Sequence, residues 1–255
     1  MNARHKGVAM MWLLNVLGNA ALILAVYGWL VLPDAHVWQV AGSAVLGIAV
    51  IFCGLWLRAG SFAYFRVAEF RDNAAVGRAF RHALRHVIAL LIWIAPLAVL
   101  EWLLSRCLLY APQFGVWFWQ KAPALRFGSP RAISHIAAWL LVCLMALLAA
   151  IWLPVASTVS AAGLRAGPML RSWRLLKSVS YWLWFIALVF GGGFLSYKLV
   201  WWIPDLSTLK QQAWSAGLRF GLAYLLLVSA WVALLLVIGD RLSKFEPQST
   251  DTEQS

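Results

Sequence analysis

Arg78-Ala79-Phe80-Arg81 is a short basic stretch whose pattern recurs later in the chain as Arg171-Ser172-Trp173-Arg174. Each copy follows one long apolar run and leads directly into another. On a helical wheel, both copies place their aromatic residue with apolar neighbours on one face and their arginines on the opposite face. The pattern predicts two amphipathic helices on the cytoplasmic surface, each entering a membrane span, and an internal parallel span-helix-span repeat.

The composition is too apolar for a water-soluble domain. The 255 residues are 63% hydrophobic and 12% charged, whereas a soluble domain carries about 25% charged residues. Runs of about 20 apolar residues are accommodated by a lipid bilayer, so we expect an all-α integral membrane protein. The three cysteines, Cys53, Cys107 and Cys143, fall in or near such runs, which predicts small buried side chains and no disulfide framework.

Six apolar runs are long enough to be transmembrane helices. We expect them at about 8–32, 40–57, 87–109, 136–155, 181–202 and 218–238, within one membrane domain covering residues 1–245. The first run is too long for the apolar part of a cleaved signal peptide, so it is expected to remain as a span. Residues 246–255 are polar and have too little apolar surface to fold, which predicts a disordered cytoplasmic tail.

The distribution of basic residues predicts the orientation. Fourteen of the 21 Lys and Arg residues fall in segments on the same side of the expected spans as the N-terminus. By the positive-inside rule both termini lie in the cytoplasm, which suits a multi-pass protein of the bacterial inner membrane. The formal charge of +12 does not indicate nucleic acid as a partner, because the basic residues alternate with apolar runs instead of covering one soluble face.

The two basic segments are the main candidate binding site. They could bind anionic lipid headgroups or an acidic cytoplasmic partner. Each basic residue near an anionic membrane surface contributes about 1 kcal/mol. The alternative is that the charge serves only to fix the topology. The candidate residues are Arg78, Arg81, Arg85, Arg171, Arg174 and Lys177.

A second set of candidates lies within the expected spans. Asn15 and Asn19 are one helical turn apart, and we expect them to hydrogen-bond a neighbouring helix or to contact a substrate. Pro96 is expected to kink the third span. The triple Gly191-Gly192-Gly193 allows close helix packing, bending or a functional hinge.

The sequence offers little chemistry for an enzyme. His82 and His86 have the i, i+4 spacing of two zinc ligands, but they lack a third ligand and stand beside arginines, so we expect packing at the interface and no metal or other cofactor. Glu101 precedes Arg106 closely enough for an ion pair at the outer surface, which we prefer to a catalytic carboxylate. No nucleophile elbow or phosphate-binding loop occurs.

The segments Gly77-Arg78-Ala79-Phe80-Arg81-His82-Ala83-Leu84-Arg85 and Gly167-Pro168-Met169-Leu170-Arg171-Ser172-Trp173-Arg174-Leu175-Leu176-Lys177 also carry a family resemblance. Each is similar to the basic helix that feeds a span in a group of bacterial six-span proteins. That group comprises the membrane domain preceding the catalytic barrel of some glycerophosphodiester phosphodiesterases and its stand-alone relatives of unknown function. The resemblance implies architecture alone, since neither the barrel nor its acidic metal ligands occur in this sequence.

Two functions follow as hypotheses. The first is a non-enzymatic membrane module that binds lipid, a protein partner or a second copy of itself. The second is a small transporter or permease subunit, for example for a lipid-like substrate. A continuous polar cavity lined by Asn15, Asn19 or the three glycines would favour transport, whereas an interior packed with Leu and Trp would favour the binding module. A membrane-embedded enzyme would need polar groups to converge in a way that the linear sequence does not reveal.

Overall fold

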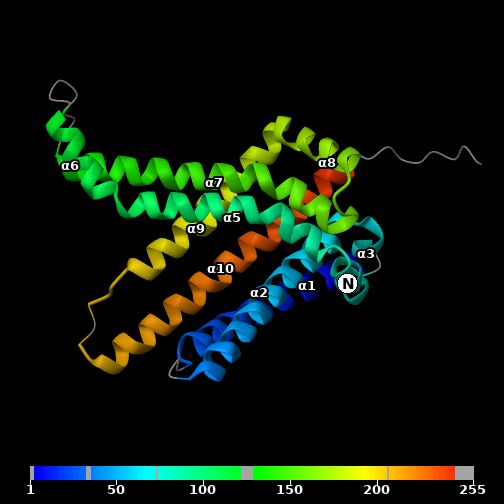
Figure 1. Cartoon of the computed structure of the whole chain (residues 1–255), viewed down its shortest axis with the longest axis horizontal. Coiled ribbons are helices and arrows are strands. Elements are labelled where there is room, and N and C mark those ends of the chain that lie inside the picture. Colours follow the sequence, from blue (N-terminus) through cyan, green and yellow to red (C-terminus); the bar gives the residue numbers. More distant parts are fainter. Residues whose placement is uncertain (1–2, 33–35, 73, 122–128, 206, 245–255) are drawn as a thin grey trace, which may run out of the picture.

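The computed structural model describes residues 3–32, 36–72, 74–121, 129–205 and 207–244, and every regular element in these ranges is a helix (Figure 1). Six of the helices are long and apolar enough to cross a membrane, so the chain is a multi-pass helical membrane protein. These six are α1 (Ala3–Leu30), α2 (Val37–Arg66), α5 (Val87–Leu109), α7 (Pro130–Ala162), α9 (Val179–Trp201) and α10 (Leu209–Ser243). The shorter elements are α3 (Ala68–Asp72), α4 (Val76–Leu84), α6 (Ala111–Lys121), α8 (Ala166–Ser172) and the 3-10 helix η2 (Trp173–Lys177).

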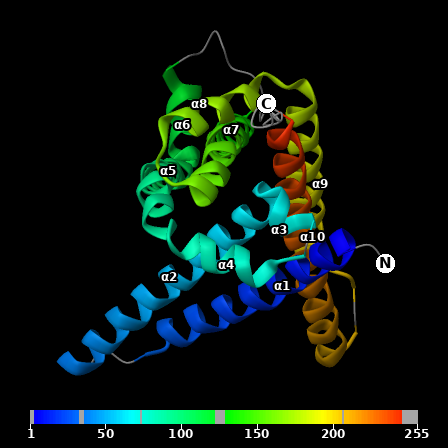
Figure 2. The ribbon, with the colours of Figure 1, turned by 90° about the vertical axis from the view of Figure 1, so that its right-hand side faces the viewer.

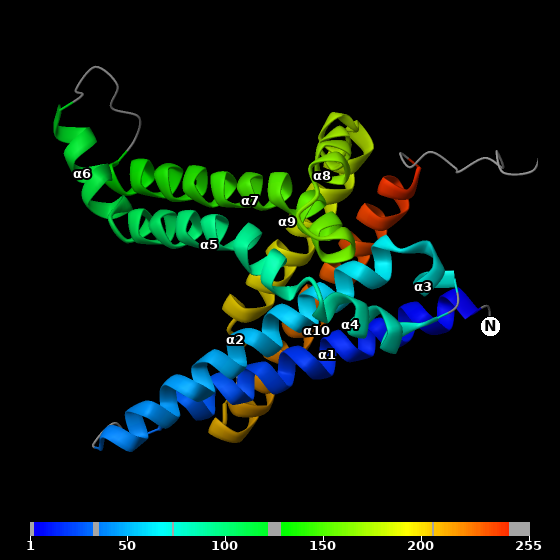
Figure 3. The same ribbon diagram turned by 45° about the vertical axis from the view of Figure 1, so that its right-hand side comes forward.

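The long helices form three pairs, α1 with α2, α5 with α7, and α9 with α10. The pairs meet at the end of the molecule that carries α3, α4 and α8, which we call the packed end (Figure 1). They diverge toward the opposite end, which carries α6 and which we call the splayed end (Figure 3). Seen along another direction, α4 crosses beside α1 and α2 while α9 and α10 run together on the far side (Figure 2).

The core lies at the packed end. Tyr64 and Phe65 of α2, Val155 of α7 and Leu235 of α10 are almost completely buried there, and α4 adds Ala79. Side chains on the outward faces of the long helices are large and apolar yet exposed, such as Leu24, Ile88 and Leu183. Exposed apolar surface on this scale is what lipid contact requires.

Close backbone contact holds the packed end together at two glycines. A Cβ on Gly239 of α10 would lie 2.2 Å from the carbonyl oxygen of Phe65, so α10 and α2 touch backbone to backbone. A Cβ on Gly60 would lie 2.5 Å from the ring of Phe80, which brings α4 directly onto α2. These two contacts anchor the helices from which the pairs diverge.

Several helices are longer than the expected spans, and α10 (Leu209–Ser243) extends past the expected 218–238 at both ends. α2 continues to Arg66 and α7 to Ala162, beyond the expected span ends at 57 and 155. The helix of the second span therefore continues past Arg58, where the expected apolar run ends. Residues 59–66 of α2 and 154–160 of α7 are buried in the protein, and protein packing accommodates small and polar residues that lipid would not. The expected disordered tail, 246–255, lies outside the described residues.

The cysteines are not in the core. Cys53, Cys107 and Cys143 are all exposed, so the prediction of three buried side chains is wrong. In a membrane protein an apolar run need not be buried by protein, because the face away from neighbouring helices is surrounded by lipid tails.

Candidate functional site

The six basic candidates all lie on the surface of the packed end. In the first segment, α4 turns Val76, Ala79 and Ala83 inward against α2 and α7, which leaves Arg78, Arg81 and Arg85 exposed. The second segment is divided between α8 and η2, with Ser172 and Leu175 buried. The exposed basic side chains of the second segment are Arg171, Arg174 and Lys177.

Both segments pack against α7, so they cover one end of the molecule. Arg78 donates a hydrogen bond of 2.9 Å to Glu69, and more than half of each of these two side chains is exposed. An ion pair so open to solvent is weak. It therefore leaves the positive potential of this surface largely intact.

His82 and His86 lie between α4, α5 and the end of α7. The His82 ring nitrogen Nε2 is 2.7 Å from the carbonyl oxygen of Ala161, and the two rings are 5.2 Å apart. Burial lowers the pKa of His86, and the positive charges of His82, Arg165 and Arg85 lower it further. Within the described ranges, no three His, Cys, Asp or Glu side chains are grouped as metal ligands would be.

A cavity of about 1110 Å³ opens between α7 and α9 at the splayed end, next to the junction of α5 and α6. We call it the α7/α9 cavity. Small side chains make room for it, including Ala138 and Ala146 of α7 and Gly193 of α9. The walls are mostly apolar, and the half-exposed rings of Trp139, Phe194 and others leave the cavity open to the surroundings. Further wall residues are Val142, Val189, Phe190 and Tyr197.

The polar groups of this cavity lie at one end. Arg131, Ser134 and His135 occupy the first turns of α7, nearest to α6, whereas the walls deeper along α7 are apolar. Ser134 donates its hydroxyl to the carbonyl of Pro130, at 2.9 Å. Arg131 and His135 are exposed. The cavity thus combines a polar rim with an apolar interior. These two parts would match the polar headgroup and the apolar chain of a lipid or another amphiphile.

The two asparagines occupy different surroundings. Asn15 is completely buried and donates to Ser61 of α2 at 3.0 Å and to the carbonyl of Met11 at 2.9 Å. Asn19 accepts a hydrogen bond of 2.9 Å from the Arg58 guanidinium and lines a second, smaller cavity. Only Asn19 is therefore beside an open space.

Pro96 and the three glycines are spread over two helices. Pro96 lies exposed within α5, and the indole of Trp152 donates to the nearby carbonyl of Trp93 at 2.8 Å. A Cβ on Gly192 would lie 2.6 Å from the Ala230 methyl group, so this glycine permits close approach of α9 and α10. A Cβ at Gly191 or Gly193 would meet nothing within 4 Å, and Gly193 faces the α7/α9 cavity.

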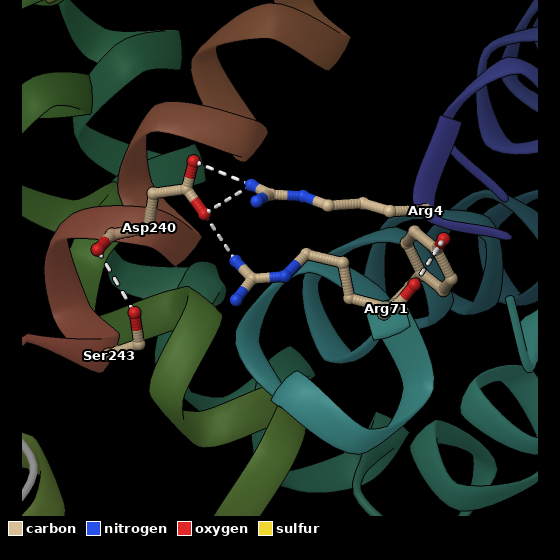
Figure 4. Close-up of polar contacts among 5 residues, drawn as sticks. Arg4, Arg71, Asp240 and Ser243 are labelled. Carbon is tan, nitrogen blue, oxygen red and sulfur yellow. Dashed lines mark hydrogen bonds and ion pairs between the residues drawn. The ribbon is translucent and has the colours of Figure 1, made fainter. Parts of the chain in front are cut away.

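Asp240 of α10 forms a junction of three segments at the packed end (Figure 4). Arg4 of α1 donates two hydrogen bonds to its carboxylate, at 2.9 and 3.0 Å. Arg71 of α3, which is buried, donates to the same carboxylate. Sequence reasoning did not single out this cluster because its members are far apart in the chain.

Sequence reasoning also missed the α7/α9 cavity and Arg58. The spacing of Ala138, Val142 and Ala146 marks one face of α7, but a run of small residues equally indicates close helix packing. Arg58 directly follows the expected second span, 40–57, and its side chain turns back to donate a hydrogen bond to Asn19 of α1. A lone arginine directly after an apolar run was the available signal.

Comparisons of the chain with protein-family models, curated proteins and solved structures find no match. The resemblance to the membrane domain of glycerophosphodiester phosphodiesterases stays a prediction.

Proposed function

We propose that the protein is a non-enzymatic phospholipid-binding module of the bacterial inner membrane. The observation that carries the proposal is the α7/α9 cavity, about 1110 Å³ in volume, with apolar walls and Arg131 and His135 at its rim. Its apolar walls would hold an acyl chain by van der Waals packing, which is the main force between apolar groups inside a bilayer. At the rim, the Arg131 guanidinium suits a phosphate oxygen.

The basic segments on α4 and on α8 with η2 would bind anionic headgroups at the other membrane surface. With both termini in the cytoplasm, these segments face the inner leaflet, where each basic residue contributes about 1 kcal/mol. As halves of an internal parallel repeat, they would act as a pseudo-symmetric pair. An acidic protein or a second copy of the chain would use the same surface, and no cofactor is needed.

The alternative, a small permease subunit, has less support. Transport of a polar substrate would use a continuous polar cavity, but Asn15 is completely buried against Ser61, and the α7/α9 cavity and the smaller cavity beside Asn19 have mostly apolar walls. A lipid-like substrate would fit those walls, so a lipid permease is the only form of the alternative that we retain.

A bulky side chain in the α7/α9 cavity tests the proposal. Gly193→Trp fills the cavity, and Gly191→Trp is the matched control, since both glycines have open space and only Gly193 lines the cavity. We expect Gly193→Trp to lower the affinity for phosphatidylglycerol about tenfold, because the indole takes the space of an acyl chain and removes its packing contacts. Native mass spectrometry of the purified protein would count the bound lipids. Equal lipid retention by the two variants would reject the site.

The surface sites are tested separately by replacing Arg78, Arg81, Arg171 and Arg174 with Gln. We expect the detergent-solubilised variant to bind phosphatidylglycerol more weakly than the wild type, with a smaller difference at high salt, because screening already reduces these interactions. Unchanged binding with unchanged topology would assign these residues a purely topological role.

A further inference from the structure

Arg58 carries a positive charge and lies within α2, one of the helices long and apolar enough to cross a membrane. It lies eight residues before the end of α2, which places it about 12 Å from that end at 1.5 Å per residue. Basic side chains near a helix end usually extend to the headgroup region. The Arg58 side chain instead turns toward α1 and α10.

Its contacts hold the guanidinium without neutralising it. One Nη donates to the Oδ1 of Asn19 at 2.9 Å, and the Cζ atom lies 4.8 Å from the ring centroid of Trp231. Both partners are uncharged. Among the described residues no carboxylate lies within ion-pair distance of Arg58, and its other N–H groups make no hydrogen bond.

Beside the guanidinium is a cavity of about 500 Å³ between α1, α2 and α10, which we call the Arg58 pocket. Its volume is within the range of about 300–1,000 Å³ that is common for ligand sites. Arg58 and Trp231 lie on the side nearer the packed end, whereas Ile23 and Val26 of α1 extend the walls toward the splayed end. Tyr224 donates its hydroxyl to the carbonyl of Val16 and adds a fixed polar edge.

We propose that the Arg58 pocket binds a membrane phospholipid, with a phosphate oxygen on the guanidinium and an acyl chain between α1 and α10. A guanidinium presents paired N–H donors that match phosphate geometry, and here part of that fork is unoccupied. The phosphate supplies the negative charge that the surrounding side chains do not. The apolar walls extend from Arg58 toward the splayed end, which is the direction an acyl chain would take from a headgroup bound at Arg58.

This site is separate from the α7/α9 cavity, and the two cavities share no lining residue. Their polar groups lie at opposite ends of the molecule. Arg131 and His135 line their cavity together with α6 residues, whereas Arg58 is nearer to the end of α2 at Arg66. The proposal for the Arg58 pocket is therefore independent of the function proposed for the α7/α9 cavity.

The test uses the full chain in detergent, titrated with phosphatidylglycerol and followed by native mass spectrometry. Arg58→Gln removes the charge, and Ile23→Trp obstructs the apolar wall while leaving Arg58 in place. The matched control is Arg106→Gln, since Arg106 also lies over a tryptophan, 5.3 Å from the Trp102 ring, but lines neither cavity. A parallel titration with inorganic phosphate separates a lipid site from a site for the free anion.

We expect Arg58→Gln and Ile23→Trp each to weaken one lipid-binding event by at least about tenfold, as the loss of a charge-assisted contact or of chain burial would. We expect Arg106→Gln to bind as the wild type does and Gly193→Trp to keep this event. Equal binding by Arg58→Gln, Ile23→Trp and wild type would overturn the proposal. Binding of inorganic phosphate that Arg58→Gln abolishes, with lipid binding unchanged, would also overturn it.

Discussion

The packed end and the splayed end of this molecule are built from the same six helices but by different means. At the packed end α2, α7 and α10 bury aromatic and aliphatic side chains against one another, and Asp240 ties α1, α3 and α10 together. At the splayed end the helix pairs separate and the α7/α9 cavity lies between two of them. The packed end stabilises the fold, and the splayed end leaves space for a ligand between α7 and α9.

This difference predicts where the chain tolerates amino-acid substitutions. A substitution at the packed end disturbs contacts between protein backbones, whereas one at the splayed end disturbs a space that we assign to lipid. Stability should therefore depend mainly on the packed end, and lipid binding in the α7/α9 cavity mainly on the splayed end. The following variants test this separation in order of expected effect.

Gly239→Ala should have the largest effect on stability. The new Cβ would lie 2.2 Å from the Phe65 carbonyl oxygen, so the α2 and α10 backbones must move apart, at a cost of about 3 kcal/mol. Thermal unfolding in detergent, followed by circular dichroism, measures the loss.

The matched control is Gly221→Ala in the same helix, where a Cβ meets nothing within 4 Å. Alanine favours helix over glycine by about 0.5–1 kcal/mol, so this variant should be as stable as the wild type or slightly more so. Equal losses at the two positions would break the contrast between the ends.

Asp240→Asn should have an intermediate effect. It removes the charge that receives hydrogen bonds from Arg4 and Arg71, and we expect a loss of about 1–3 kcal/mol. The same unfolding measurement applies. Asp205→Asn, at an exposed position beyond α9, should change stability little, and a comparable loss there would show that Asp240 has no special role.

His86 gives the smallest effect, which appears as a pH dependence. Its pKa in the folded protein is below 6.5, so as the pH falls through about 6.5 the unfolded chain binds the proton first and the free energy of unfolding decreases. Above that pH both states are neutral at this ring, and no effect is expected.

Arg165→Gln removes one of the positive charges that lower this pKa. We expect the pKa to move up toward its ordinary value, as measured by NMR of labelled histidine, while Arg174→Gln leaves it where it is. A pKa that does not respond to Arg165→Gln would show that this charge does not act on His86.

The helices were predictable from sequence where lipid decides the structure. The third span was expected at 87–109, and α5 has these bounds, because a continuous apolar run ends at polar residues on both sides. The helices are longer than the expected spans where protein packing decides. The ends of α2 and α7 hold Ser61, Thr158 and Ser160, whose hydroxyls donate to carbonyls within the same helix, so a small polar run continues as buried helix.

Less of the candidate site was predictable. The exposure of Arg78 and Arg171 followed from helical periodicity, which is a local property of the sequence. The Arg58 pocket brings together Asn19 of α1, Arg58 of α2 and Trp231 of α10. Contacts between side chains on different helices depend on the angles at which the helices cross, and the pattern of hydrophobic residues does not predict those angles.

The central claim, that lipid fills the space between α7 and α9, can be tested directly by photo-cross-linking in membranes. Benzoyl-phenylalanine replaces Phe190, which lines the α7/α9 cavity, or Phe185, which is buried in the same helix. The account predicts phospholipid adducts at position 190 and none at position 185. Adducts only to other parts of the chain at position 190 would show that α7 and α9 close on each other and would contradict the account.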